Sequence, residues 1–331
     1  MNTAHTGSLL HPLMQQYITF QQALGRRYHT EQYVLAGLER FLAHHTTPDL
    51  TAETFAAWGR TQSHLKPGVR RARLRIVRNF CLYRQRTDPQ CFIPDPQVFP
   101  APHQPLHPHL FTETEIIRLL HVAACLRPVP RAPLRAEVFR LAIILLYTTG
   151  LRRGELLRLV IGDYDPRAQT LLIRASKFHK SRYLVLAPDG ARELEQYLQA
   201  RRRHHLPVNA DIPLIGHGYA QGRAYTGGGL GIILRQLCHS AAIHTADGRC
   251  PRVHDFRHSF AVQAILRWYR NGDDVQAKLL FLATYMGHVS IASTAYYLPL
   301  IEALAGVASA RFAAQYAALV VPLSQSREVN P

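Results

Sequence analysis

The sequence predicts a mainly α-helical protein of two domains, with one small β-hairpin in the second domain. Apolar residues recur at spacings of three and four along much of the chain, as expected for helices that bury one face. Residues 93–109 are rich in proline, which removes backbone donors and disfavours helix, so this segment is expected to be a linker. Two short apolar runs around a polar turn predict the hairpin. The domains are therefore expected at residues 1–92 and 110–331.

Four helices are expected before the linker. Apolar spacing predicts the first two around residues 13–20 and 33–42. A third is expected to begin after Thr51, with Glu53 in its first turn. The fourth runs from about residue 67 to residue 86 and combines an apolar stripe with a dense set of cations. The stripe expected to be buried comprises Val69, Leu74, Val77, Cys81 and Leu82.

The cations of this fourth helix are candidates for contact with a ligand. No acidic residue lies among them, so they repel one another unless a counter-charge comes from elsewhere. A run of charge is usually a solvated helix face, but this density favours a face that meets DNA phosphates. The predicted DNA-binding residues are Lys66, Arg70, Arg71, Arg73, Arg75 and Arg78, and the same helix also carries Arg84 and Arg86.

The second domain is expected to open with a helix whose capping box pairs Thr112 with Glu115. Residues 136–147 are apolar enough to form its central buried helix. The strands of the hairpin are predicted at residues 171–174 and 183–186, on either side of the polar turn. Further helices are expected at about 191–204 and 229–243, after His254, Val275 and Ser290, and at about 301–319.

Charge and cysteine content narrow the class of partner and the compartment. A formal net charge of +17 favours a polyanion, because each cation near a phosphate releases condensed counterions. The most apolar run, residues 141–146, is far shorter than the roughly 20 residues that span a bilayer, and the N-terminus carries no secretory pattern. Five scattered cysteines without a C-x-x-C pair argue against disulfides or a zinc site. A cytoplasmic, DNA-associated protein without a metal site is expected.

Residues able to hold and attack a phosphodiester occur at several places in the second domain. Arg152 follows a Thr-Thr-Gly turn, and His254 and Arg257 fall within about one helical turn of each other. His288 follows a glycine, and Tyr297 stands nine residues later. An arginine can place two donors on two phosphate oxygens, while a histidine can donate to a third. Singly, the arginines and histidines have structural explanations, but together with a phenol they form a set that a packed core does not need.

These residues resemble, in order and spacing, the boxes of tyrosine recombinases of the phage-integrase family. Residues 149–156 match the first box as Thr-Gly-Leu-Arg-x-x-Glu-Leu, and residues 254–258 match the second as His-x-x-Arg-His. Residues 287–297 match the third, whereas Phe256 stands where leucine is commoner in the family. The resemblance is close over about residues 110–300, and the first domain resembles the helical core-binding domain in size, position and basic character alone. A C-shaped, two-domain DNA clamp with a C-terminal catalytic domain is implied.

The resemblance implies a role for each residue of these boxes. Tyr297 attacks a DNA phosphorus to give a 3′-phosphotyrosine and a free 5′-hydroxyl, while Arg152 and Arg257 stabilise charge on the non-bridging oxygens. His254 and His288 add hydrogen bonds, and His254 also assists removal of the phenol proton. No metal, ATP or other cofactor is implied, because the cations supply positive charge and the covalent link conserves the phosphodiester.

The general acid is expected in the hairpin turn. The pattern Ser-Lys-x-x-Lys-x-Arg at residues 176–182 matches the family's turn and assigns Lys177 as the group that protonates the departing 5′-oxygen. Lys180 and Arg182 compete with Lys177 for this role, because hairpin turns tolerate shifts of register.

Three further side chains accompany these residues in the boxes. Glu155 and His258 are expected to hold the arginines in place, and a purely structural role suits them equally well. Tyr296 adjoins Tyr297, and successive helical residues point about 100° apart, so only one of the two tyrosines faces the phosphate. The spacing from His288 selects Tyr297 as the nucleophile and leaves Tyr296 as a packing residue.

The resemblance also implies a homotetramer on double-stranded DNA, or an assembly with related recombinases, formed from monomers. The expected activity is site-specific recombination of the integrase or transposase type. Two alternatives share the fold: a type IB topoisomerase-like relaxase, and a catalytically silent DNA-binding protein, which would lack the tyrosine or an arginine. A metal-dependent nuclease would need clustered carboxylates. In the family the C-terminal tail often docks on a neighbouring protomer, and here its apolar residues are Leu304, Val307, Phe312, Tyr316, Leu319 and Val320.

Overall fold

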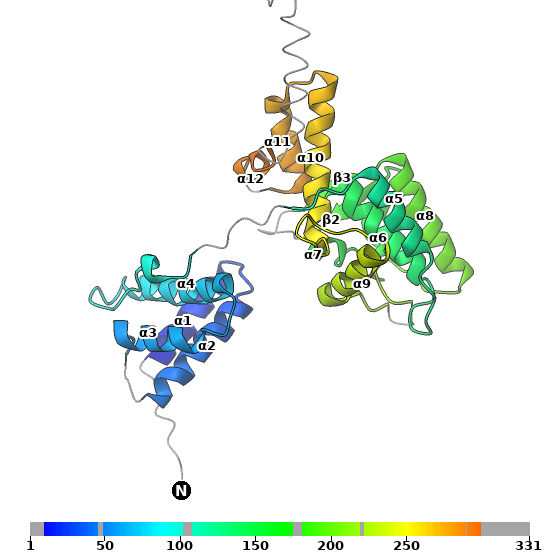
Figure 1. The fold of residues 1–331 in the computed structure, drawn as a ribbon. Coiled ribbons are helices and arrows are strands. Elements are labelled where there is room, and N and C mark those ends of the chain that lie inside the picture. Colours follow the sequence, from blue (N-terminus) through cyan, green and yellow to red (C-terminus); the bar gives the residue numbers. More distant parts are fainter. Residues whose placement is uncertain are drawn as a thin grey trace, which may run out of the picture. The chain divides into compact units, whose positions relative to one another are not determined.

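The computed structural model describes residues 10–45, 49–101, 108–174, 181–218, 222–288 and 290–298. The chain is mostly helical and folds into two compact units, Met1–Leu106 and His107–Pro331 (Figure 1). The second unit contains a small antiparallel sheet of three strands. The predicted fold class, mainly α with one small β-element, is confirmed. Within the described ranges, none of the helices is long and apolar enough to cross a membrane.

The first unit consists of four helices around one apolar core, and all four predicted helices are present. The hydroxyl of Thr51 accepts a hydrogen bond from the backbone amide of Thr54 and caps the third helix. Pro67 occupies the first turn of the fourth, where its missing N–H costs nothing. The elements are α1 (Leu10–Ala23), α2 (His29–His44), α3 (Ala52–Thr61), α4 (Pro67–Arg84) and the 3₁₀-helix η1 (Pro96–Val98).

The buried face of α4 differs from the predicted stripe at three positions. Val69 and Leu82 are exposed, whereas Phe80 is fully buried beside Val77. Val69 lies in the first turn of the helix, and Leu82 is five residues beyond Val77, which turns it well away from the buried face. The apolar stripe therefore follows Leu74, Val77, Phe80 and Cys81.

The first half of the proline-rich segment packs on α4. Phe99 is buried in the core of the first unit, with its ring 6.1 Å from that of Phe55. Nη1 of Arg71 donates to the carbonyl of Pro100 at 2.7 Å, and Nε of Arg78 donates to the carbonyl of Pro94 at 3.0 Å. Side-chain donors on α4 thus bind carbonyls of the proline-rich segment.

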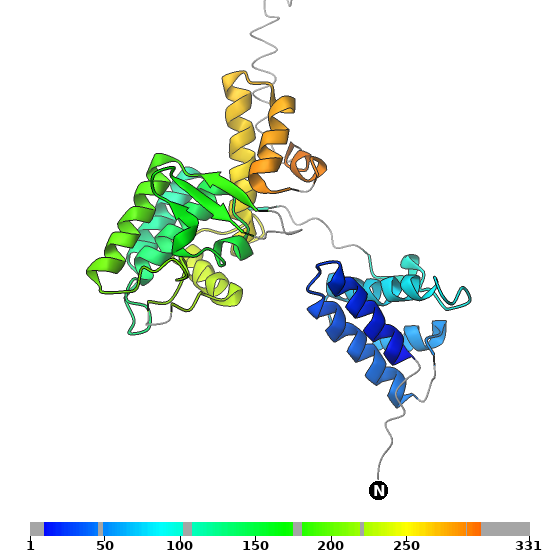
Figure 2. The ribbon, with the colours of Figure 1, turned by 180° about the vertical axis from the view of Figure 1, so that it is seen from behind.

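The second unit is built around α6, the predicted central helix, whose apolar residues are mostly buried. Helices α5, α8 and α10 pack against α6, and the sheet lies on one side of this helical layer (Figure 2). The predicted capping box is confirmed, because Glu115 N donates to the Thr112 hydroxyl and Thr112 N donates to the Glu115 carboxylate. The helices are α5 (Glu113–Ala124), α6 (Arg135–Thr149), α7 (Arg153–Leu156), η2 (Ile161–Asp163), α8 (Pro188–Arg203), α9 (Gly227–Ser240), α10 (Val253–Asn271), α11 (Val275–Met286) and α12 (Ala292–Ala295).

The sheet has the order β1-β2-β3, with both pairs antiparallel. Strands β2 (Thr170–Ile173) and β3 (Arg182–Val185) form the predicted hairpin, each displaced by one residue from its expected position. Strand β1 (Tyr164–Asp165) was not predicted, because two residues carry no detectable alternation. Ile173 pairs with Arg182 at the end of the ladder next to the turn. The turn residue Lys177 lies outside the described residues.

Helix α10 joins two apolar clusters of the second unit. At its start Phe256 stacks on Phe111 with ring centroids 4.3 Å apart, in the main core around α6. Further along, Ile265 is buried in a smaller cluster with α11 and Tyr297. The boxes found in the sequence therefore meet where α10 begins and α11 ends.

Two helices have boundaries that differ from the predicted ones, and the helix after Ser290 is short. Helix α8 begins at Pro188, a favourable first-turn residue, rather than near residue 191. Helix α9 covers Gly227–Ser240, starting after the Thr226 cap, rather than residues 229–243. Helix α12 has only four residues. The helix expected at residues 301–319 lies outside the described part of the chain.

Candidate active site

The structure brings five of the six predicted catalytic residues together at the start of α10 and the end of α11. Arg152 lies just before α7, His254 and Arg257 lie in the first turns of α10, and His288 follows α11. Tyr297 lies just after α12, with its ring 6.1 Å from that of His288 and nearly parallel to it. The sixth residue, the hairpin lysine, is outside the described residues.

The C-terminal end of α11 is the centre of this arrangement. A helix leaves its last carbonyls without intrahelical partners, and its dipole makes that end negative. Here the three successive carbonyls of residues 285–287 accept hydrogen bonds from three different arginines. Arg182 Nε donates to the first at 2.8 Å, Arg257 Nη2 to the second at 2.8 Å, and Arg152 Nη2 to the third at 2.7 Å. The helix end therefore holds three cations in one place.

Arg257 is almost completely buried, with 1% of its surface exposed. Its Nη1 donates to the carbonyl of Gly150, the left-handed residue that ends α6, at 2.6 Å. Burial first, and then the nearby charge of Arg152, lower the pKa of Arg257 to about 10. A guanidinium fixed between two helix ends, α6 and α11, has little freedom to reorient.

Glu155 is the buried counter-charge of the other two arginines. It accepts hydrogen bonds from Nη1 and the backbone N of Arg152 at 2.8 and 3.0 Å, and from both terminal nitrogens of Arg182 at 3.1 Å. Burial alone raises the pKa of Glu155, but the hydrogen bonds and charges of the two arginines overcome it and lower the pKa to about 2. Glu155 is thus ionised at neutral pH.

Of the histidines of the site, His258 is buried, His288 is half-buried and His254 is exposed, and all three are neutral at pH 7. Burial first, and then the neighbouring His254 and Arg257 respectively, lower the pKa values of His258 and His288 to about 4. Burial of part of the ring also lowers the pKa of His254. His288 Nδ1 lies 2.7 Å from the hydroxyl of Thr294, which fixes the orientation of the ring. His258 Nδ1 is buried without a hydrogen-bond partner among the described residues.

These lowered pKa values predict a loss of stability in mild acid. As pH falls from about 6.5 to 4, the unfolded chain takes up protons on histidines that the folded chain keeps neutral, so the free energy of unfolding decreases. His258→Phe removes one such group and is expected to make Tm fall less steeply between pH 7 and 4. Thermal unfolding across this range measures the slope, with His121→Phe, at an exposed histidine of α5, as the control. Equal slopes in wild type and His258→Phe would contradict the prediction.

The two adjacent tyrosines lie in different environments. Tyr297 is 3% exposed, and its ring also contacts that of His258 at 5.5 Å. Burial raises the pKa of the Tyr297 phenol, while the charge and a hydrogen bond of Arg257 partly offset this. Tyr296 is 44% exposed. The ring of Tyr296 still contacts those of Tyr297 and His258, at 5.7 and 6.2 Å, so Tyr296 packs against the site with one side while its other side is exposed.

The cations of α4 divide into two groups. Arg71, Arg78 and Arg73 donate to acceptors of their own unit, the last to the Gln62 side chain at 2.6 Å. Lys66 and Arg75 are exposed on the helix, and Arg70 is half-buried, with Nε lacking a partner among the described residues. Part of the predicted DNA-binding set thus also stabilises the fold of the first unit.

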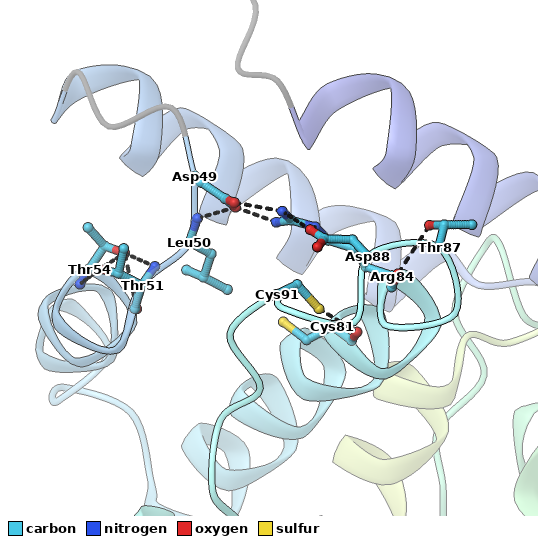
Figure 3. Close-up of polar contacts among 9 residues, drawn as sticks. All are labelled: Asp49, Leu50, Thr51, Thr54, Cys81, Arg84, Thr87, Asp88 and Cys91. Carbon is cyan, nitrogen blue, oxygen red and sulfur yellow. Dashed lines mark hydrogen bonds and ion pairs between the residues drawn. The ribbon is translucent and has the colours of Figure 1, made fainter.

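A counter-charge from outside the helix is present at the C-terminal end of α4. Figure 3 shows Arg84 between Asp49, which precedes α3, and Asp88, which follows α4. Nη2 of Arg84 donates to carboxylate oxygens of both aspartates at 2.6 Å. Both aspartates lie outside α4, so the sequence of the helix alone does not reveal them.

Two supporting residues of the site were missed at the sequence level. Thr294, fully buried, orients His288, and its position three residues before Tyr297 carries no motif signal. Arg182 was considered as a rival to Lys177, whereas the structure places it on Glu155 and α11. Only the tertiary structure brings the hairpin beside the end of α11.

Comparisons with known proteins identify the family of the chain. Residues 110–302 match the model of the phage integrase family. The putative integrase/recombinase y4rB of Sinorhizobium fredii is 33% identical over 288 residues, covering 86% of this chain and 91% of that protein. The fold is similar to XerH recombinase in a post-cleavage complex with DNA, with 18% identity, coverage of 85% and 78% of the two chains and a TM-score of 0.61. It is also similar to a lambda integrase tetramer bound to a Holliday junction, with 15% identity, coverage of 88% and 78% and a TM-score of 0.60. The chain belongs to the phage integrase family and is a site-specific DNA recombinase of the tyrosine type.

Proposed function

We propose that this recombinase breaks and rejoins DNA through a 3′-phosphotyrosine link to Tyr297, without metal or ATP. The observation that carries the proposal is the convergence of Arg152, Arg257 and His288 with this tyrosine at the end of α11. Attack by the phenol on phosphorus forms the tyrosyl–phosphate bond and releases the 5′-oxygen of the next nucleotide. The reverse reaction, with a 5′-hydroxyl as nucleophile, reseals a strand and frees the tyrosine.

The charges of the site suit this reaction. Each guanidinium has five N–H groups, so Arg152 and Arg257 retain donors for phosphate oxygens beyond those given to carbonyls. Negative charge on these oxygens grows toward the pentacoordinate transition state, and the two arginines stabilise that state more than the starting phosphodiester. His254 is neutral because burial lowers its pKa, so its imidazole can accept the phenol proton.

Lys177 is proposed as the general acid that protonates the departing 5′-oxygen. Lys177→Ala is therefore expected to slow cleavage by about 10²- to 10⁴-fold. A 5′-bridging phosphorothioate leaves without protonation and is expected to restore cleavage by this variant. Single-turnover assays on matched oxygen and sulfur substrates measure both effects. Lys180→Ala is the control, and rescue of Lys180→Ala in place of Lys177→Ala would transfer the role to Lys180.

Double-stranded DNA is the proposed partner, bound by a homotetramer during strand exchange. The lambda integrase structure in the comparison is a tetramer on a Holliday junction, and this chain's net charge of +17 favours a polyanion. Residues 1–92 are proposed as the core-binding domain, residues 93–109 as the linker and residues 110–331 as the catalytic domain. In the first domain the exposed Lys66 and Arg75 are the strongest candidates for phosphate contacts. Because the proposed substrate is DNA, the protein is proposed to act at the chromosome, in the nucleoid.

Trapping of the covalent intermediate tests the proposal. Duplexes covering the DNA that flanks the gene are incubated with the protein in EDTA and separated under denaturing conditions. The reactive duplex is then made with a nick beside the scissile phosphate, so that the released fragment diffuses away and the adduct accumulates. We expect adduct without metal, and recombinant products from two intact duplexes. A requirement for Mg²⁺ would overturn the mechanism, and relaxation of plasmids without exchange would indicate a topoisomerase.

A further inference from the structure

Three arginines, rather than the two of the sequence boxes, meet the end of α11. Arg182 is the first residue of β3 and pairs with Ile173 of β2. Its Nε donates to the Tyr285 carbonyl at 2.8 Å, and its terminal nitrogens donate to the two carboxylate oxygens of Glu155 at 3.1 Å each. The side chain is 13% exposed. Protein acceptors therefore engage all three nitrogens of this guanidinium.

We propose that Arg182 is a positioning residue that fixes Glu155 and the end of α11, and through them Arg152 and the turn that carries His288. The inference rests on the proposed roles of Arg152 and His288 in catalysis. Glu155 uses one oxygen for Nη1 of Arg152 and Arg182 together, and the other for the Arg152 backbone and Arg182. A carboxylate shared in this way holds both arginines in one geometry.

The glycine after α11 supports this placement. Gly287 has a φ of +69°, and a Cβ at this position would lie 2.8 Å from Nη1 of Arg182 and 3.4 Å from Nη1 of Arg152. Both guanidinium groups therefore lie against the same glycine. Two like charges this close need the buried carboxylate of Glu155 between them. Loss of Arg182 would leave Glu155 partly unpaired and free Arg152 to change position.

The same contacts exclude Arg182 as the general acid. A guanidinium does not release its proton in proteins, and its donors here face Glu155 and the Tyr285 carbonyl. Arg182 thus ceases to be a competitor of Lys177. Arg182 is the first residue of β3, the strand that follows the turn containing Lys177. Through Glu155 it connects this strand to Arg152.

Cleavage kinetics of Arg182→Ala test the proposal, with Arg140→Ala as the matched control. Arg140 makes a similar two-nitrogen contact to Glu193, at 3.0 and 3.2 Å, in the same unit but outside the site. At saturating protein on the nicked duplex, Arg182→Ala is expected to cleave about 10- to 100-fold more slowly with little change in DNA affinity, the size typical of losing a group that orients a site residue. A 5′-bridging phosphorothioate is expected not to rescue it. Arg182→Lys, which keeps the charge but cannot make the paired contact, should show the same pattern.

A double-mutant cycle and hydrogen exchange complete the test. If Arg182 acts through Glu155, Arg182→Ala combined with Glu155→Gln should be no slower than the slower single variant. Exchange of the amides of residues 284–288 should rise at least about tenfold in Arg182→Ala and stay unchanged in Arg140→Ala. Additive rates, rescue by sulfur, or unchanged exchange would overturn the proposal. Exchange does not depend on cleavage, so a wild type that forms no adduct would refute the phosphotyrosine mechanism and still leave the role of Arg182 measurable.

Discussion

Tyr297→Phe is expected to form no covalent adduct with DNA while still binding it. The substitution removes the one oxygen proposed to attack phosphorus and leaves the ring in its contacts with His258 and His288. Because the ring is buried and the hydroxyl is a small part of its contacts, the fold is expected to persist. Denaturing electrophoresis on the nicked duplex measures the adduct, and a native mobility shift measures binding.

The neighbouring tyrosine provides the matched control for this prediction. Tyr296→Phe makes the same chemical change one residue earlier, on a side chain that is 44% exposed rather than 3%. It is expected to form adduct at close to the wild-type rate. Adduct that persists in Tyr297→Phe and disappears in Tyr296→Phe would assign the nucleophile to the exposed tyrosine, and would mean that the turn after α12 rearranges when DNA binds.

The sequence was sufficient for the fold class and for most of the site because both are encoded locally. Helical periodicity, the Thr112 capping box and the polar hairpin turn depend on residues within a few positions of one another. The spacing between Arg257 and His288 follows from an antiparallel pair of helices, α10 and α11, so the boxes identify residues that must meet. The boxes can be recognised from their order along the chain without knowledge of side-chain contacts.

What the sequence could not provide depends on contacts between distant segments. Arg182 meets Tyr285, more than a hundred residues away, through a strand and a helix that no local pattern places side by side. Asp49 neutralises Arg84 across 35 residues, which the helix sequence did not indicate. The burial of Tyr297 relative to Tyr296 depends on the four-residue helix α12, which packs on α11.

Arg257→Lys is expected to lower the cleavage rate by about 10³-fold or more. Lysine preserves the positive charge but replaces a planar fork by a single ammonium, which cannot reach Gly150, Met286 and a phosphate oxygen together. Loss of one preorganised donor to a developing oxyanion typically costs about 10²- to 10³-fold, and here the contact to Tyr297 is lost as well. Single-turnover cleavage, at a temperature well below Tm, measures the effect.

Arg201→Lys separates the catalytic loss from the cost of disturbing a buried arginine. Arg201 is also 1% exposed in the same unit, and it donates to the carbonyl of Pro207 and the hydroxyl of Tyr197. Both variants leave buried acceptors incompletely paired, so a comparable decrease in Tm is expected for each. Cleavage should fall in Arg257→Lys alone, because that guanidinium also faces the nucleophile. Equal loss of cleavage in both variants would attribute the effect to stability, and near-wild-type cleavage in Arg257→Lys would remove its fork from the mechanism.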